Sequence, residues 1–222
     1  PYPNSIPGNI VSCFVEDADK NTWVGMDGSG IASFDKGNRT FIHYGIREGL
    51  KSESVLDVCE IDSRTIAVAT WNGGLNLFDR NSKRFKQFLY KTPRVDANVQ
   101  NVFGLRFDKK ANMLWCSTYG DGVQIFDCAK REFLSQEKLK QVFPFWNTSI
   151  FNFKTVVDGE STWVLDGLSP VRVEEDSVFR YSDSSRNCQT LFFITDLLID
   201  RNGNIWVSQY DGIAKYDKKA DC

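Results

Sequence analysis

One short pattern recurs along the whole chain and limits the folds open to it. An alternating apolar segment is followed by a tight turn rich in glycine, then by a second apolar segment that ends in an aromatic residue and an aspartate. Trp115–Asp127 shows the pattern most fully. Alternation on both sides of a glycine turn predicts a β-hairpin. Close copies begin at Trp23, Ala67 and Trp206, and a degraded copy begins at Trp163.

The copies are evenly spaced, starting 43 to 48 residues apart. Repetition at this period, with strand-type patterning in every unit, is typical of the blades of a β-propeller. Helical repeat folds are disfavoured because no unit carries a convincing apolar stripe at helical spacing. We therefore predict an all-β fold, a β-propeller of four-stranded antiparallel blades. The repeated tryptophans are expected to lie in its core.

Five blades can be placed along the sequence. We expect them at about residues 10–44, 54–89, 101–135, 149–181 and 192–217. Each begins with an innermost strand, such as Val11–Asp17 or Val102–Asp108, and four end in an outer strand, such as Thr40–Tyr44. The fifth stops after its hairpin. Because a propeller closes by pairing strand material from its two ends, residues 1–222 are predicted to be part of a larger, seven-bladed ring.

Composition and charge exclude several classes of function. The formal net charge is −2, with Lys and Arg scattered, so no nucleic-acid role is expected. No apolar run reaches the roughly 18 residues that a membrane-spanning helix needs. The cysteines at 13, 59 and 116 fall in strand patterns and are predicted to be buried thiols.

Metal and cofactor sites are not expected. The chain has a single histidine, His43, and no Cys-x-x-Cys spacing. The turns Asp17–Asn21 and Asp200–Asn204 match the first half of a calcium loop but lack its closing glutamate, so ordinary hairpin-turn chemistry explains them better. We predict no metal, no cofactor and no catalytic residue.

The repeat unit resembles a known family. Glu16–Gly25, Ile199–Ser208 and Thr70–Asp79 combine the Asp/Asn-rich turn, the Trp-Val-Gly/Ser step and the Gly-x-Gly and Phe-Asp elements of the two-component regulator propeller repeat. The resemblance covers four units clearly and the unit at Trp163 weakly. The motif specifies the fold strongly and the ligand hardly at all.

The resemblance implies a function and a location. The family looks like the periplasmic sensor region of hybrid two-component systems of Bacteroides-type bacteria, in which paired propellers respond to oligosaccharides released from polysaccharides. It implies a non-catalytic domain of an inner-membrane histidine kinase that controls polysaccharide-utilisation genes. Its implied partners are an oligosaccharide and the second propeller and downstream domains of the parent protein. A homodimer is left open.

The glycine turns supply the candidate ligand site. In a four-stranded meander the turn between the second and third strands lies on the same side as the linker into the next blade. Aromatic rings beside carboxylates and amides suit a sugar, whose C–H face stacks while its hydroxyls form hydrogen bonds. The turns of four blades place seven such side chains there: Asp27, Trp71, Asn72, Tyr119, Asp121, Tyr210 and Asp211.

Three other interpretations of these side chains stay open. The rings of Trp71, Tyr119 and Tyr210 can instead wedge between blades, because a repeated motif usually encodes structure. The same face can also bind a polypeptide, which would make the chain a protein-interaction scaffold. A polysaccharide-active enzyme would need an acid and a base, for which only Asp27, Asp121 and Asp211 are placed.

Overall fold

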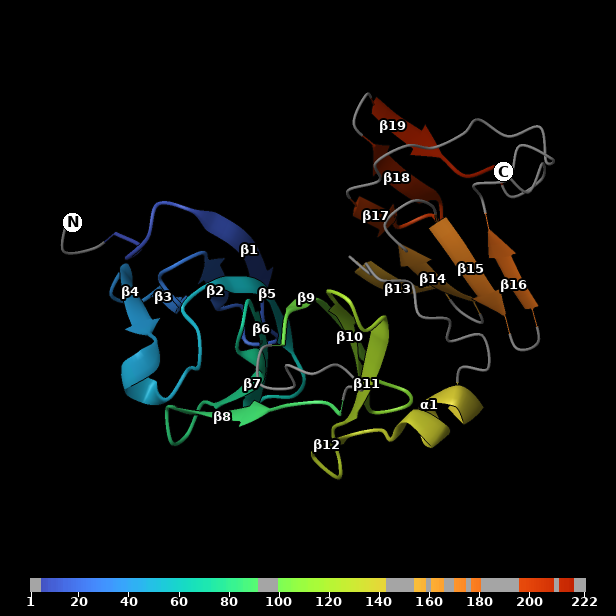
Figure 1. Ribbon diagram of the computed structural model, residues 1–222. Coiled ribbons are helices and arrows are strands. Elements are labelled where there is room, and N and C mark those ends of the chain that lie inside the picture. The colour runs from blue at the N-terminus through green and yellow to red at the C-terminus, as the bar shows by residue number, and fades with distance from the viewer. Residues whose placement is uncertain are drawn as a thin grey trace. The chain divides into compact units, whose positions relative to one another are not determined.

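The strands form five antiparallel sheets that follow one another along the chain (Figure 1). The computed structural model describes residues 5–91, 100–142, 154–158, 161–165, 170–174, 177–180, 196–209 and 212–217. Over these ranges four sheets have four strands each and the last has three. The predicted all-β fold class is confirmed, and each sheet is a meander in which strands adjacent in sequence are paired.

The strands of the first two sheets are β1 Val11–Glu16, β2 Thr22–Met26, β3 Ile31–Asp35, β4 Thr40–Tyr44, β5 Val55–Glu60, β6 Thr65–Thr70, β7 Gly74–Asp79 and β8 Arg84–Phe88. The third sheet consists of β9 Val102–Asp108, β10 Met113–Thr118, β11 Val123–Asp127 and β12 Glu132–Phe133. The last two sheets consist of β13 Lys154–Asp158, β14 Ser161–Leu165, β15 Pro170–Glu174, β16 Ser177–Arg180, β17 Asp196–Ile199, β18 Ile205–Gln209 and β19 Gly212–Lys215.

The repeated tryptophan forms the core between neighbouring sheets. Trp23 on β2 is buried and contacts Tyr44 of its own sheet and Phe78 of the next, at ring-centroid distances of 6.0 and 5.7 Å. Trp115 and Trp163 are also buried, as predicted. Trp206 is only half-buried. A large ring at this register fills the space between two sheets, so its truncation would leave a cavity.

The second sheet has Ala67 where the other sheets have tryptophan. Ala67 is fully buried in an apolar cluster with Cys116, and the half-buried Cys59 and Cys128 pack against that cluster. The thiols therefore occupy a region where another repeat has an aromatic ring. Cys116 is buried as predicted, whereas Cys13 and Cys59 are only partly covered.

The first strands of successive sheets lie side by side. β1 runs beside β5, β5 runs beside β9, and β13 runs beside β17. Ser12 donates a 2.6 Å hydrogen bond to the carbonyl of Val55, and the Asp57 carboxylate accepts one of 2.8 Å from the backbone N–H of Leu105. Neighbouring blades are thus tied through backbone atoms on their innermost strands.

The chain divides into two compact units. One contains Pro1–Cys116 and Gln124–Ser135, and the other contains Ser117–Val123 and Gln136–Cys222. The second unit holds a feature that the sequence did not predict, a seven-residue helix α1 at Gln136–Val142. Leu139 of this helix is fully buried, but so short a helix cannot show an apolar stripe over several turns. No helix in the described ranges has the length and apolarity to cross a membrane.

Candidate functional site

The glycine turns repeat one backbone conformation. Gly30 and Gly122 come just before the third strands of their sheets and Gly74 is the first residue of its third strand; their φ angles are 65°, 66° and 65°. A Cβ on Gly30 would lie 2.6 Å from the carbonyl oxygen of Tyr44, and one on Gly74 would lie 2.9 Å from a methyl of Leu89. Only glycine meets both the left-handed conformation and the close approach without strain. The turns therefore hold the residues before these glycines in equivalent places.

Each of the first two turns meets the linker that leads into the next sheet. The backbone N–H of Gly30 donates to the carbonyl of Glu53 at 2.9 Å, and that of Gly74 donates to the carbonyl of Gln100 at 2.8 Å. These bonds place turns and linkers on one side of the first unit, as the antiparallel strand order predicts. We call this side the glycine-turn face, formed by residues 27–30, 52–54, 71–74 and 100–103.

Asp27 and Trp71 meet at a linker serine on this face. The exposed Asp27 carboxylate accepts a short hydrogen bond from the hydroxyl of Ser54. The backbone carbonyl of Ser54 accepts the N–H of Trp71 at 2.9 Å. A single linker residue therefore connects the carboxylate of the first sheet with the aromatic residue of the second.

Trp71 is partly packed and partly open to solvent. Its ring lies edge-on to Phe103, with 5.7 Å between centroids and an interplanar angle of 84°, and the residue is 38% exposed. The neighbouring Asn72 has a φ of 62°, and its backbone N–H donates a 2.7 Å bond to the side-chain oxygen of Asn101. The indole thus supports the next sheet, and part of its surface is exposed.

The remaining predicted site residues are placed as follows. Tyr119 is 42% exposed and Asp121 half-buried in the hairpin tip that belongs to the second unit. That tip keeps the same turn, since the Thr118 hydroxyl donates to the Gly122 carbonyl at 2.6 Å, as Thr70 does to Gly74 at 2.9 Å. Tyr210 and Asp211 lie outside the described residues. The structure thus joins Asp27, Trp71 and Asn72 on one face.

The sequence pattern missed three residues of this face: Ser54, Asn101 and Phe103. All three lie at the junction of a linker and the first strand of the next sheet. Ser54 and Asn101 directly precede β5 and β9, so the rule that turns and linkers share a side could have selected them. Phe103 is within β9, where strand alternation alone gives no reason to assign it to a turn.

The opposite ends of the strands carry a buried charge cluster. Asp17 accepts the indole N–H of Trp23 at 2.8 Å and the backbone N–H of Asn21 at 2.8 Å. Arg80 reaches Asp17 and Glu60, each at 3.0 Å. Burial alone would raise the pKa of Asp17, but the bonds from Trp23 and Asn21 and the charge of Arg80 together lower it.

The last sheet repeats the same turn. Asp200 accepts the indole N–H of Trp206 and the backbone N–H of Asn204, both at 2.9 Å, and these partners lower its pKa. Hairpin-turn chemistry is therefore the role of both Asp/Asn turns, as predicted. Among the described residues, no group of three or more His, Cys, Asp or Glu side chains is placed to hold a metal ion.

Comparison with known proteins supports the repeat and the fold. Residues 5–28 match the family model described as two component regulator propeller, which confirms the resemblance drawn from the sequence. No curated protein matches the chain. Similar solved structures are the extracellular domains of two putative B. thetaiotaomicron proteins, the hybrid two component system BT3049 and the one component system BT4673.

The BT3049 domain has a TM-score of 0.75 and 18% identity over 97% of this chain and 29% of that chain. The BT4673 domain has a TM-score of 0.79 and 17% identity over 97% of this chain and 28% of that chain. A computationally designed protein, Ika8, has a TM-score of 0.62 and 11% identity over 93% and 57% of the two chains. The β-propeller fold is thereby confirmed, and the chain spans less than a third of the two bacterial domains.

Proposed function

We propose, from the two component regulator propeller repeat that this chain carries, that it is a non-catalytic ligand-sensing region of a hybrid two-component system. The repeat match at residues 5–28 is the observation that carries the proposal. The similar extracellular domains from B. thetaiotaomicron support it, since both belong to regulatory systems by their descriptions. The parent protein would be an inner-membrane histidine kinase, with this region in the periplasm.

The proposed ligand is an oligosaccharide released during polysaccharide breakdown. On the glycine-turn face, the exposed side of Trp71 would stack against the C–H face of one sugar ring. Asp27 would accept hydrogen bonds from its hydroxyls, and the Asn72 amide would both donate and accept. Binding would change how this region sits against the second propeller of the parent protein, and so the kinase output that controls polysaccharide-utilisation genes.

Calorimetry on the intact ectodomain with an oligosaccharide panel, combined with product analysis, tests this proposal. We expect binding without turnover. Trp71→Ala should weaken binding by about tenfold or more, since stacking of this kind is worth on the order of 1 kcal/mol beyond the lost area. Asn72→Gly removes the amide while keeping a residue suited to the φ of 62°.

Phe14→Ala is the matched control, because Phe14 is an aromatic residue of the same unit that is 78% exposed and lies outside the glycine-turn face. Unchanged affinity in Trp71→Ala would remove the site assignment. Turnover of the oligosaccharide would favour a polysaccharide-active enzyme. Failure of every sugar, together with binding of a polypeptide at this face, would favour a protein-interaction scaffold.

A further inference from the structure

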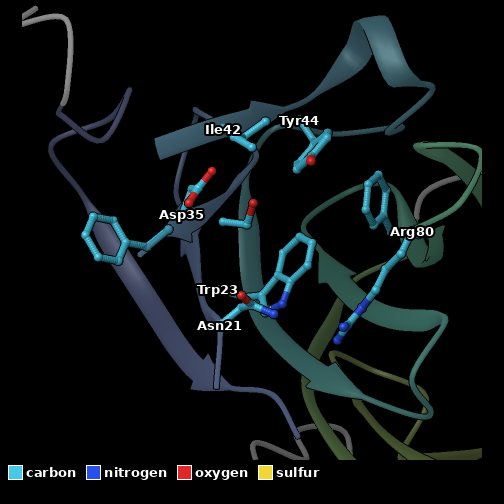
Figure 2. Close-up of a pocket in the computed structure, with 9 residues that line it drawn as sticks. Asn21, Trp23, Asp35, Ile42, Tyr44 and Arg80 are labelled. Carbon is cyan, nitrogen blue, oxygen red and sulfur yellow. The ribbon is translucent and has the colours of Figure 1, made fainter. Parts of the chain in front are cut away.

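A pocket is lined by residues of the first two sheets (Figure 2), and Asn21, Asp35 and Arg80 line it at the strand ends opposite the glycine turns. Its volume is about 370 Å³, near the lower end of the range for sites that bind small molecules. Both sheets contribute to it, all within the first unit. The lining residues are Asn21, Trp23, Ser33, Phe34, Asp35, Ile42, Tyr44, Phe78 and Arg80.

The pocket has an aromatic floor. Trp23, Tyr44 and Phe78 are buried and in mutual contact, with the rings of Tyr44 and Phe78 4.6 Å apart and those of Trp23 and Tyr44 stacked at 6.0 Å. Ile42 is 41% exposed and adds an apolar wall at the mouth, on the same side as Tyr44 in Figure 2. A floor of this kind favours a ligand with a flat apolar body.

Arg80 lines the pocket, yet its positive charge is already compensated. Its guanidinium contacts Asp17 and Glu60 at 3.0 Å each and Asp19 at 3.5 Å, and it lies 5.4 Å from the centroid of the Trp23 ring. Three carboxylates around one guanidinium leave this cluster with a net negative charge. An anionic ligand would therefore meet no excess positive charge here.

Asp35, at the opposite side of the pocket, differs from its counterparts in the next two sheets. Asp35, Asp79 and Asp127 each end a third strand and accept two backbone N–H groups of the turn that follows. Asp79 is also paired with Arg64 at 2.6 Å, and Asp127 with Lys130 at 3.5 Å.

No ion pair of Asp35 is found among the residues that the structure describes. The adjacent Lys36 is instead 3.8 Å from Glu16. Hydrogen bonds from Asn38 hold the pKa of Asp35 below its usual range, so the side chain is charged at neutral pH. Asp35 thus lies beside an aromatic cavity with no cationic partner in the described part of the chain, whereas Asp79 and Asp127 each have one.

Nearby polar groups add acceptors. Asn21 donates its side-chain N–H groups to Asp17 at 3.2 and 3.3 Å, so its side-chain oxygen can accept hydrogen bonds. The hydroxyl of Ser33 can accept as well. Ammonium and guanidinium groups carry several N–H donors and no acceptor, so they match this set.

We propose that this pocket binds a small organic cation, an ammonium or guanidinium group carried on a flat apolar body. The cation lies against Asp35 and the body lies over Tyr44 and Ile42. The site is separate from the glycine-turn face and is independent of the proposed oligosaccharide binding.

The test uses the full chain and two probes of the same shape, phenethylammonium and 2-phenylethanol, followed through the backbone amide shifts of a protein NMR spectrum. Phenethylammonium should shift amides at residues 21, 33–35 and 42–44, and should bind several-fold more tightly than the neutral alcohol. Asp35→Asn retains an oxygen to accept the backbone N–H groups of the turn. It should weaken the binding of phenethylammonium about fivefold and leave the affinity for 2-phenylethanol unchanged.

Asp127→Asn is the matched control, since Asp127 holds the same turn position away from the pocket. It should leave both affinities unchanged. Equal affinity for the two probes would show an apolar cavity without preference for charge and would overturn the proposal. Shifts confined to the glycine-turn face, or an Asp35→Asn variant that binds the cation as wild type does, would also overturn it.

Discussion

Replacing Asp17 by asparagine tests how the charge cluster holds the first two sheets together. The carboxylate has no exposed surface, and Arg80 has only 14% of its side chain exposed. The indole of Trp23 donates to one carboxylate oxygen of Asp17 and the backbone N–H of Asn21 donates to the other. Asparagine has a single acceptor oxygen, so the substitution removes the charge opposite Arg80 together with one of these two hydrogen bonds.

The magnitude follows from what remains around Arg80. Removing one partner of a buried ion pair typically costs about 3–5 kcal/mol. Glu60 still lies 3.0 Å from the guanidinium and Asp19 lies 3.5 Å away, so the remaining charge is not isolated. We therefore expect a loss of about 3 kcal/mol for Asp17→Asn. The pair itself should account for at least ~1 kcal/mol of coupling in a double-mutant cycle with Arg80→Gln.

Hydrogen exchange followed by mass spectrometry of the peptide containing β2 is the assay, because it reports the opening of this sheet itself. Protection should fall by about two orders of magnitude in Asp17→Asn. Asp200→Asn changes the same turn in the last sheet and should leave the β2 peptide unchanged. The reasoning would be refuted by strictly additive effects of Asp17→Asn and Arg80→Gln, since additivity would mean that the two side chains do not interact.

Three further predictions concern turns, thiols and acid stability. Gly30→Ala should lower the free energy of unfolding by about 1–3 kcal/mol, measured by thermal denaturation. Gly28→Ala should cost clearly less, because Gly28 has a φ of 80° but nothing close to an added Cβ. Equal losses would contradict the role of the Tyr44 carbonyl. Burial raises the pKa of Cys13 to about 12, so its alkylation at pH 8 should be on the order of a thousandfold slower in the native protein than in urea, and comparable rates would refute this. The Arg64 guanidinium lowers the pKa of Asp79 to about 2. The pair therefore stabilises the folded protein fully above about pH 4 and loses this effect as the pH falls toward 2. The difference in melting temperature between wild type and Arg64→Gln should shrink over that window, and a constant difference would exclude the pair as its cause.

Much of the strand layout was predictable because each repeat contains turn-forming residues that mark the ends of its strands. The predicted strands Thr40–Tyr44 and Val102–Asp108 agree with β4 and β9 residue for residue. Glycine, asparagine and aspartate mark the turns on either side, and alternation marks the strands between them. The helix α1 was not predicted because seven residues are too few to show a periodic apolar signal, although Leu139 is buried.

The candidate sites show the limit of the same logic. The register of the turns was enough to bring Asp27 and Trp71 to one face. The contact between Trp71 and Phe103 was not predictable, because it depends on how far apart two sheets pack. The pocket at Asp35 was missed for a related reason: Arg80 and Tyr44 come from different sheets, and nothing in their local sequence shows that they share a cavity.

The hydrogen bond from Asp57 to the backbone N–H of Leu105 bears on how such a chain can diverge. The acceptor is a particular side chain, but the donor is an amide that every amino acid except proline supplies. This hydrogen bond therefore places no demand on the side chain at position 105, which is selected instead by its packing against the apolar cluster around Cys116, whereas position 57 must keep an acceptor. In a lineage of these repeats, the bond between blades can survive any substitution at position 105 except proline.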